Sequence, residues 1–281
     1  MKPCIHFAHA NGVPSATYEK MLACLRDEYD VITVPLIGTE SRYPVTNHWT
    51  RLVDQVIDSI EQQAQGRPVI ALGHSMGGLL SFMASYKRPE LMDQLIMLDP
   101  PLINGMPSLG LHLAKTLRPK TVDKLTPAGV SARRRDHWES REQAAELLRN
   151  KGFFANFDPE CFAAYIEHGL KDVPQGGVTL TIPKAVEVAV FRNNPSWFWL
   201  KPRHAPKPPA RLVVGEDSQF YKRGFPQRLE RQLKINCHVS RGGHMFPLER
   251  PEQTAIMVKG LIRQLNAEKK NPKNIKKSKS Y

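Results

Sequence analysis

The chain has 281 residues, of which 41% are hydrophobic and 24% are charged, a composition typical of a globular protein with a full core. Its net charge is +13, but residues 267–281 alone carry six lysines and one glutamate, so the charge does not indicate a specific nucleic-acid-binding protein. The four cysteines form no C-x-x-C pair, which excludes a zinc site or a disulfide framework of the usual spacings.

Targeting and cofactor signals are absent from the sequence. The first residues lack the apolar stretch of a secretory signal, and no apolar run approaches the roughly 18 residues of a membrane-spanning helix. These features predict a cytoplasmic protein without a transmembrane segment. No P-loop, dinucleotide fingerprint or metal-ligand cluster is present, so we expect neither cofactor nor metal.

The first hundred residues alternate short β-branched runs with amphipathic segments. The runs predict strands at residues 5–9, 31–36, 69–72 and 95–98. The amphipathic segments predict helices at residues 17–28, 47–65 and 77–87, the last ended by Pro89. Strands and helices in this order predict a parallel sheet with helices on its faces.

The alternation stops at residue 102 and resumes after the proline-rich segment 202–209. Strands at 211–214 and 235–240 and helices at 226–233 and 252–265 then complete the pattern. The predicted fold class is α/β, with a mostly parallel central sheet of about six strands. Residues 1–101 and 209–266 would form the core, 102–208 an inserted helical cap, and 267–281 a basic, solvated tail.

A nucleophile motif lies between the third strand and the helix that follows it. Gly73-His74-Ser75-Met76-Gly77 fits G-x-S-x-G, in which a sharp strand-to-helix turn exposes the serine hydroxyl. A glycine-rich turn whose serine only caps the helix is the alternative interpretation. The strand–turn–helix setting favours Ser75 as a nucleophile.

A serine hydroxyl needs a base to take its proton, and that base needs an acid to orient it. His244 is the candidate base, because it lies in a glycine-containing loop directly after a late strand. Asp217, just after the strand at 211–214, is the first choice of acid; Glu216 and Asp99 are the alternatives. The chain order Ser75, Asp217, His244 matches the order expected on an α/β sheet.

The loop His9-Ala10-Asn11-Gly12 follows the first strand, where an oxyanion hole is expected. The backbone amides of Asn11 and Met76 are its candidate donors. A simple strand-ending turn is the alternative for this loop, because asparagine and glycine are common in such turns.

These motifs together resemble the α/β-hydrolase family, with its oxyanion loop at His9–Gly12, its nucleophile elbow at Gly73–Gly77 and its histidine loop at Gly243-His244. The resemblance implies a serine enzyme that cleaves a small-molecule carboxylic ester or thioester through an acyl-enzyme. It also implies an acid three positions after the glycine that ends the strand, Gly215. Ser218 occupies that position here, and Asp217 lies only two positions after Gly215.

The predicted insertion would cover the carboxyl edge of the sheet and select the substrate. Its aromatic residues could line an acyl pocket or only pack within the cap, and its arginines could bind an anion or only face solvent. These residues are Phe153, Phe154, Phe157, Trp197, Phe198 and Trp199, and Arg133, Arg134, Arg135 and Arg141. Alternatives to the ester hydrolase are a non-catalytic ligand-binding relative and a hydrolase of an amide or C–C bond.

Overall fold

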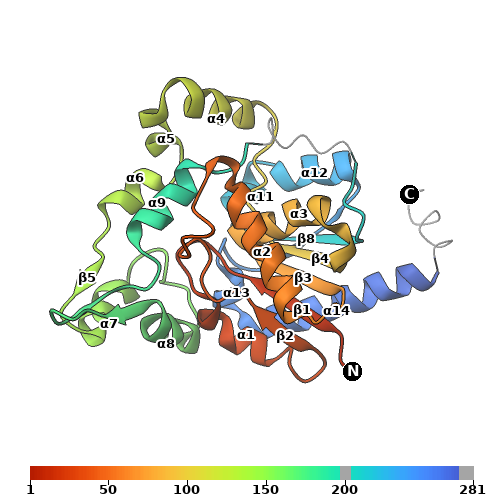
Figure 1. The fold of residues 1–281 in the computed structure, drawn as a ribbon, viewed down its shortest axis with the longest axis horizontal. Helices are drawn as coiled ribbons and strands as arrows, with labels where there is room; N and C mark the ends of the chain where they lie inside the picture. Colours follow the sequence, from red (N-terminus) through yellow and green to blue (C-terminus); the bar gives the residue numbers. More distant parts are fainter. Residues whose placement is uncertain (197–203, 272–281) are drawn as a thin grey trace.

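The computed structural model describes residues 1–196 and 204–271 (Figure 1). A six-stranded sheet has the order β2-β1-β3-β4-β8-β9, and every neighbouring pair in it is parallel. Its strands are β1 (Cys4–Ala8), β2 (Asp30–Thr33), β3 (Val69–His74), β4 (Met92–Leu98), β8 (Ala210–Gly215) and β9 (Asn236–Ser240). The predicted α/β fold with about six parallel strands is therefore confirmed.

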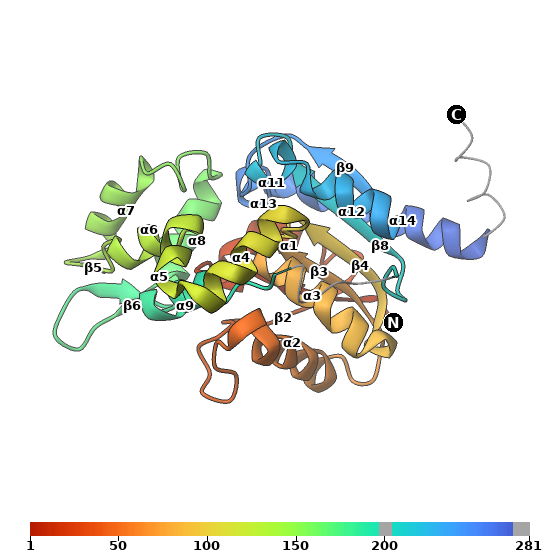
Figure 2. The same cartoon turned by 90° about the horizontal axis from the view of Figure 1, so that it is seen from above.

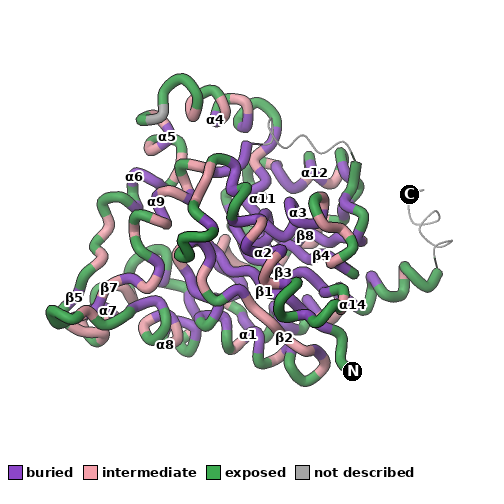
Figure 3. Tube along the Cα trace, in the orientation of Figure 1, coloured by how far each residue is buried: buried purple, intermediate pink, exposed green. Residues whose placement is uncertain are grey.

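Helices cover both faces of this sheet, because its strands carry apolar side chains on both sides. In β1, Ile5 and Phe7 belong to the core beneath one face, and Cys4 and Ala8 to the core beneath the other. The first core is closed by α1 (Glu19–Ala23) and α14 (Pro251–Lys270), and the second by α2 (Thr50–Gln63), α3 (Met76–Lys87) and α12 (Phe225–Leu233). Figure 3 shows the central strands as largely buried.

Short elements complete the core. They are η1 (Ser15–Tyr18), η2 (Asn47–Trp49), η3 (Pro89–Leu91), α11 (Gln219–Lys222) and α13 (Phe246–Glu249). The helix expected over residues 17–28 is shorter than predicted, because η1 and α1 end at Ala23 and turns follow to Tyr29.

The segment between β4 and β8 folds beside the sheet (Figures 1 and 2). It contains α4 (Met106–Leu117), α5 (Pro119–Leu125), α6 (Ala128–Arg133), α7 (Arg141–Arg149), α8 (Pro159–His168) and α9 (Lys184–Arg192). It also contains a small antiparallel sheet of β5 (His137–Trp138), β7 (Val178–Leu180) and β6 (Leu170–Asp172), which the sequence pattern did not predict. Strands of two or three residues are too short to show an alternation.

The last helix is longer than predicted. Helix α14 continues to Lys270, where the sequence pattern indicated a tail from residue 267. Its final turn is fixed to the sheet, because Glu268 pairs with Arg211 of β8 and Lys269 Nζ lies 2.6 Å from Asp93 Oδ1 of β4. Residues 272–281 of the predicted tail lie outside the described residues. Within the described part of the chain, no helix combines the length and apolar character needed to cross a bilayer.

Candidate active site

Ser75 stands at a sharp turn between β3 and α3. Its backbone angles are φ 52° and ψ −117°, a conformation that is strained for a residue with a side chain. The neighbouring glycines make the turn possible, since a Cβ on Gly77 would lie 2.1 Å from the carbonyl oxygen of Ala8 and one on Gly73 would lie 2.4 Å from that of Gly77. The turn is thus the strand-to-helix elbow that the motif predicted, and Ser75 is partly exposed.

Three side chains from distant parts of the chain meet at the carboxyl edge of the sheet. The Oγ of Ser75 lies 2.9 Å from Nε2 of His244, and Nδ1 of His244 lies 2.5 Å from Oδ2 of Asp99. Ser75 follows β3, Asp99 follows the adjacent β4, and His244 lies in the loop after β9. This is the relative geometry of a nucleophile, a general base and an orienting carboxylate.

The carboxylate of Asp99 is completely buried and fully hydrogen-bonded. Its Oδ1 accepts from the backbone N–H of Gly215 at 3.2 Å, and its Oδ2 also accepts from the hydroxyl of Ser218 at 2.5 Å. Ser218 occupies the position where the family resemblance implied the acid, and here it donates to an acid from the neighbouring strand. A buried carboxylate with these donors is held in one orientation against the imidazole.

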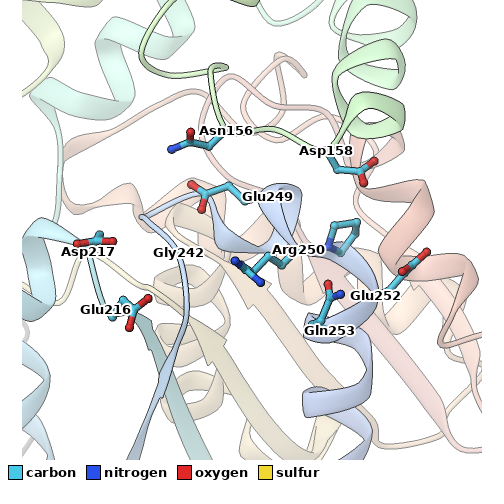
Figure 4. Close-up of a pocket in the computed structure, with 10 residues that line it drawn as sticks. Asn156, Asp158, Glu216, Asp217, Gly242, Glu249, Arg250, Glu252 and Gln253 are labelled. Carbon is cyan, nitrogen blue, oxygen red and sulfur yellow. The ribbon is translucent and has the colours of Figure 1, made fainter.

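Asp217, the first choice of acid from sequence, is not at the imidazole. Its carboxylate is 67% exposed and pairs with Lys222 Nζ at 3.0 Å. With the alternative Glu216 it lines a cavity of about 570 Å³ beside the site, together with Glu249 and Arg250 (Figure 4). The structure therefore favours the alternative Asp99 over Asp217, because the carboxylate of Asp99 contacts Nδ1 of His244, whereas that of Asp217 contacts Lys222.

The loop that carries His244 is held from behind by Glu249 of α13. One carboxylate oxygen of Glu249 accepts from the backbone N–H of Gly243 at 2.9 Å, and burial raises the pKa of this carboxyl group above its usual value. Gly242 has φ 110°, and a Cβ there would lie 2.5 Å from Glu249. The two glycines that the sequence pattern noted therefore let the loop close around this carboxylate.

The loop after β1 lies next to the elbow. The N–H of Gly77 donates to the carbonyl of His9 at 3.1 Å, which brings the amides of Asn11 and Met76 to the same end of the sheet as Ser75. The buried ring of His9 fixes this loop: its Nδ1–H donates to the carbonyl of Ala10 at 2.7 Å, and its Nε2 accepts from the N–H of Ile37 at 2.8 Å. Within the described part of the chain, the amides of Asn11 and Met76 donate to no protein acceptor.

The insertion contacts this loop through Glu187 of α9. Asn11 Nδ2 donates to the carbonyl of Glu187 at 3.1 Å, and a Cβ on Gly12 would lie 2.9 Å from the carboxylate of Glu187. That carboxylate is itself bound inside the insertion by Ser131 Oγ at 2.7 Å and by Arg134 at 3.0 Å. The predicted cap thus touches the predicted oxyanion loop directly.

Most of the aromatic and basic residues noted in the insertion have structural partners. Phe154 packs edge-on against Phe157, with ring centroids 5.3 Å apart, and both are buried in the core beneath α8. Arg134 pairs with Glu187, and Arg141 pairs with Asp172 at 2.5 Å. Trp197, Phe198 and Trp199 lie outside the described residues. No group of three or more metal-ligating side chains occurs among residues 1–196 and 204–271.

Three fully buried histidines predict acid sensitivity of the fold. Burial lowers the pKa of His6 to about 3, that of His9 to about 4 and that of His74 to about 3, so all three are neutral in the folded protein. Unfolded chains bind these protons near pH 6.5, so the stabilisation is complete above pH 6.5 and is lost as the pH falls toward 4. Between pH 7 and 5 we expect each histidine to lower the free energy of unfolding by about 2 kcal/mol.

Urea unfolding at pH 7 and pH 5 measures this effect. His6 lies away from Ser75. In His6→Gln, the difference in the free energy of unfolding between pH 7 and pH 5 should be about 2 kcal/mol smaller than in the wild type. His168→Gln, at an exposed position on α8, is the control and should leave the pH dependence unchanged. Equal pH dependence in His6→Gln and the wild type would contradict the assignment.

Comparison with known proteins agrees with this fold. Residues 7–256 match the model of the alpha/beta hydrolase family. A type I acyl-CoA thioesterase from Penicillium brevicompactum is 31% identical over 108 residues, which are 38% of this chain and 22% of that protein, so the chain spans about a fifth of this relative. E-2-(acetamidomethylene)succinate hydrolase has a similar structure, with a TM-score of 0.72 and 20% identity over 94% of this chain and 92% of the other. The thioesterase domain from the curacin biosynthetic pathway gives a TM-score of 0.69 with 18% identity, over 92% and 91% of the two chains.

Proposed function

Because the chain belongs to the alpha/beta hydrolase family, we propose that it is a serine hydrolase that cleaves a small-molecule carboxylic ester or thioester. The contact of Ser75 Oγ with His244 Nε2, together with that of His244 Nδ1 with Asp99, carries this proposal. In the proposal, Ser75 is the nucleophile, His244 the general base and Asp99 the acid that orients it.

Acylation follows from the positions of these atoms. Ser75 Oγ attacks the acyl carbon while its proton moves to Nε2 of His244, and Asp99 stabilises the imidazolium that forms. The amides of Asn11 and Met76 donate to the oxyanion of the tetrahedral intermediate. The intermediate collapses when the imidazolium gives its proton to the leaving alcohol or thiol, which leaves an acyl-enzyme on Ser75.

Deacylation uses the same groups in reverse roles. Water loses a proton to Nε2 of His244 as its oxygen attacks the acyl carbon, and the imidazolium then returns this proton to Ser75 Oγ. The products are a carboxylic acid and a regenerated hydroxyl. The free donors at Asn11 and Met76 and the partial exposure of Ser75 support both steps.

The insertion is proposed to act as the cap that selects the acyl group. Its α9 contacts the loop at Asn11 and Gly12, which places it next to the proposed oxyanion hole. The cavity of about 570 Å³ is an unsuitable acyl pocket, since Asp158, Glu216 and Asp217 line it and Ser75 does not. We therefore propose that the acyl chain binds on the side of Ser75 that faces α9.

A fluorophosphonate probe and a substrate panel test the proposed activity. We expect stoichiometric labelling, with the adduct on the peptide that contains Ser75, and turnover of short p-nitrophenyl esters or acyl-CoA thioesters. Amide and β-diketone substrates in the same panel test the cleavage of amide and C–C bonds. Absence of both labelling and turnover across the panel would favour a non-catalytic ligand-binding relative.

A further inference from the structure

A buried chain of hydrogen bonds connects the loop of His244 with the loop of Asn11. His74, the residue directly before Ser75, donates from Nε2 to the carbonyl of His244 at 2.8 Å. Its Nδ1 lies 2.7 Å from the hydroxyl of Tyr18, and that hydroxyl accepts from the N–H of Ala10 at 3.3 Å. Tyr18 and His74 are both 0% exposed.

The protons in this chain have only one consistent arrangement. A carbonyl oxygen can only accept, so Nε2 of His74 carries the hydrogen in its bond to His244. Burial lowers the pKa of His74 to about 3, so its Nδ1 is an unprotonated acceptor and the Tyr18 hydroxyl donates to it. The phenol oxygen is then free to accept from the N–H of Ala10. In each of the three hydrogen bonds, the donor is therefore the group nearer to the Asn11 loop and the acceptor is the group nearer to the His244 loop.

Each end of this chain of hydrogen bonds binds a backbone segment of the proposed catalytic machinery. At one end, the bound carbonyl belongs to His244 itself, whose ring also lies 5.3 Å from that of His74 between centroids. At the other end, the N–H of Ala10 donates to Tyr18. The carbonyl of Ala10, which belongs to the same peptide group as the N–H of Asn11, accepts from the ring of His9. His74 also shares the backbone of the elbow with Ser75.

We propose that His74 and Tyr18 are positioning residues, which keep the imidazole of His244 and the oxyanion loop in register with Ser75. This inference rests on the proposed function. Neither side chain would touch the substrate, because both are completely buried. They would instead act by limiting the displacement of two loops that have no strand hydrogen bonds to each other, and displacements of about 1 Å in an active site are costly for catalysis.

Two substitutions of His74 test its two hydrogen bonds separately. In His74→Gln the amide nitrogen can take the place of Nε2 and donate to the carbonyl of His244, whereas the acceptor for Tyr18 is lost. In His74→Asn the amide oxygen can take the place of Nδ1 and accept from Tyr18, whereas the bond to His244 is lost. We expect kcat to fall by about 100-fold in His74→Asn with KM within about twofold. In His74→Gln it should fall by no more than about tenfold, the loss expected for Tyr18→Phe, because both variants break the bond between these two side chains.

Tyr18→Phe and a matched control complete the kinetic test. Tyr18→Phe should lower kcat by about tenfold, and the fold losses of Tyr18→Phe and His74→Asn should not multiply in the double variant, because both act through one chain. Tyr43→Phe is the control, since Tyr43 is also buried but its hydroxyl bonds to Asp58. It should lose stability without losing kcat. Equal kcat in His74→Asn, His74→Gln and the wild type would overturn the proposal.

Histidine NMR gives a readout that does not depend on turnover. In the wild type, His74 should remain the neutral Nε2–H tautomer between pH 8 and 5. The Nδ1 proton of His244, which bonds Oδ2 of Asp99, should exchange with water faster in His74→Asn than in the wild type, and at the wild-type rate in His74→Gln. If His244 responds in this way but the wild type hydrolyses nothing, the proposed function fails and the positioning of the loop stands. If the wild type is active and His244 does not respond, the positioning role fails alone.

Discussion

Ser75→Ala is expected to lower kcat for ester or thioester hydrolysis by on the order of 10⁴- to 10⁶-fold. The loss follows from the removal of the hydroxyl oxygen that lies 2.9 Å from His244 Nε2 and that would carry the acyl group. Hydrolysis of a chromogenic ester by purified wild type and variant measures this loss, and labelling by the fluorophosphonate should disappear with it.

Ser81→Ala is the matched control for this experiment. Ser81 lies on α3, six positions after Ser75, and its buried hydroxyl has no hydrogen-bond partner within the described part of the chain. Its removal should leave both the fold and the activity unchanged. Full labelling of Ser75→Ala, or equal losses in the two variants, would contradict Ser75 as the nucleophile.

Asp99→Asn is expected to lower kcat by about 10⁴-fold, whereas Asp217→Asn should keep kcat within about twofold of the wild type. An amide at position 99 would offer an N–H where His244 Nδ1 needs an acceptor, so the imidazole would present the wrong tautomer to Ser75. At position 217 the carboxylate is 67% exposed and pairs with Lys222, so its charge contributes little.

The pair of variants is measured under the same conditions, with circular dichroism as a check that each is folded. Asp99→Asn keeps an oxygen that can accept from Gly215 N–H, so the strand end should stay intact. The opposite result, with a large loss in Asp217→Asn and a small one in Asp99→Asn, would return the role of the acid to Asp217.

The sheet and the contact of Ser75 with His244 could be predicted from sequence because both follow from strong local patterns. Alternating strands and helices determine a parallel sheet, and the glycines around Ser75 and His244 mark the two places where the backbone approaches closely. These signals lie within a few residues of the side chains that they concern. The positions of Ser75 and His244 at the edge of the sheet could therefore be predicted from local patterns.

The acid could not be chosen in this way, since Asp99 and Asp217 both follow strands that end at the same edge of the sheet. The choice depends on the direction in which each side chain leaves its strand end, which is set by non-local contacts. Asp99 has φ 43° and its N–H bonds the carbonyl of Val213 on β8, which fixes its carboxylate toward Ser218 and His244. Only the assembled sheet brings these groups together.

Two further residues of the site left little trace in the sequence. His74 is part of the motif, but the partners of its ring come from residues 56 and 170 positions away. Tyr18 lies in a segment whose sequence pattern predicted a helix and nothing about the site. The small sheet of the insertion was missed for a related reason, because strands of two or three residues are set by pairing rather than by periodicity.

The insertion lies at a place in the sequence where it could change in evolution independently of the residues at the edge of the sheet. Ser75 and Asp99 both precede it, His244 follows it, and all three lie just after strands of one sheet. Segments between β4 and β8 could therefore be exchanged or lengthened without moving the reacting atoms, provided that the new segment supplies a partner for Asn11. Chimeras made at these two junctions would be expected to change which compound is accepted while the bond-breaking step stays the same.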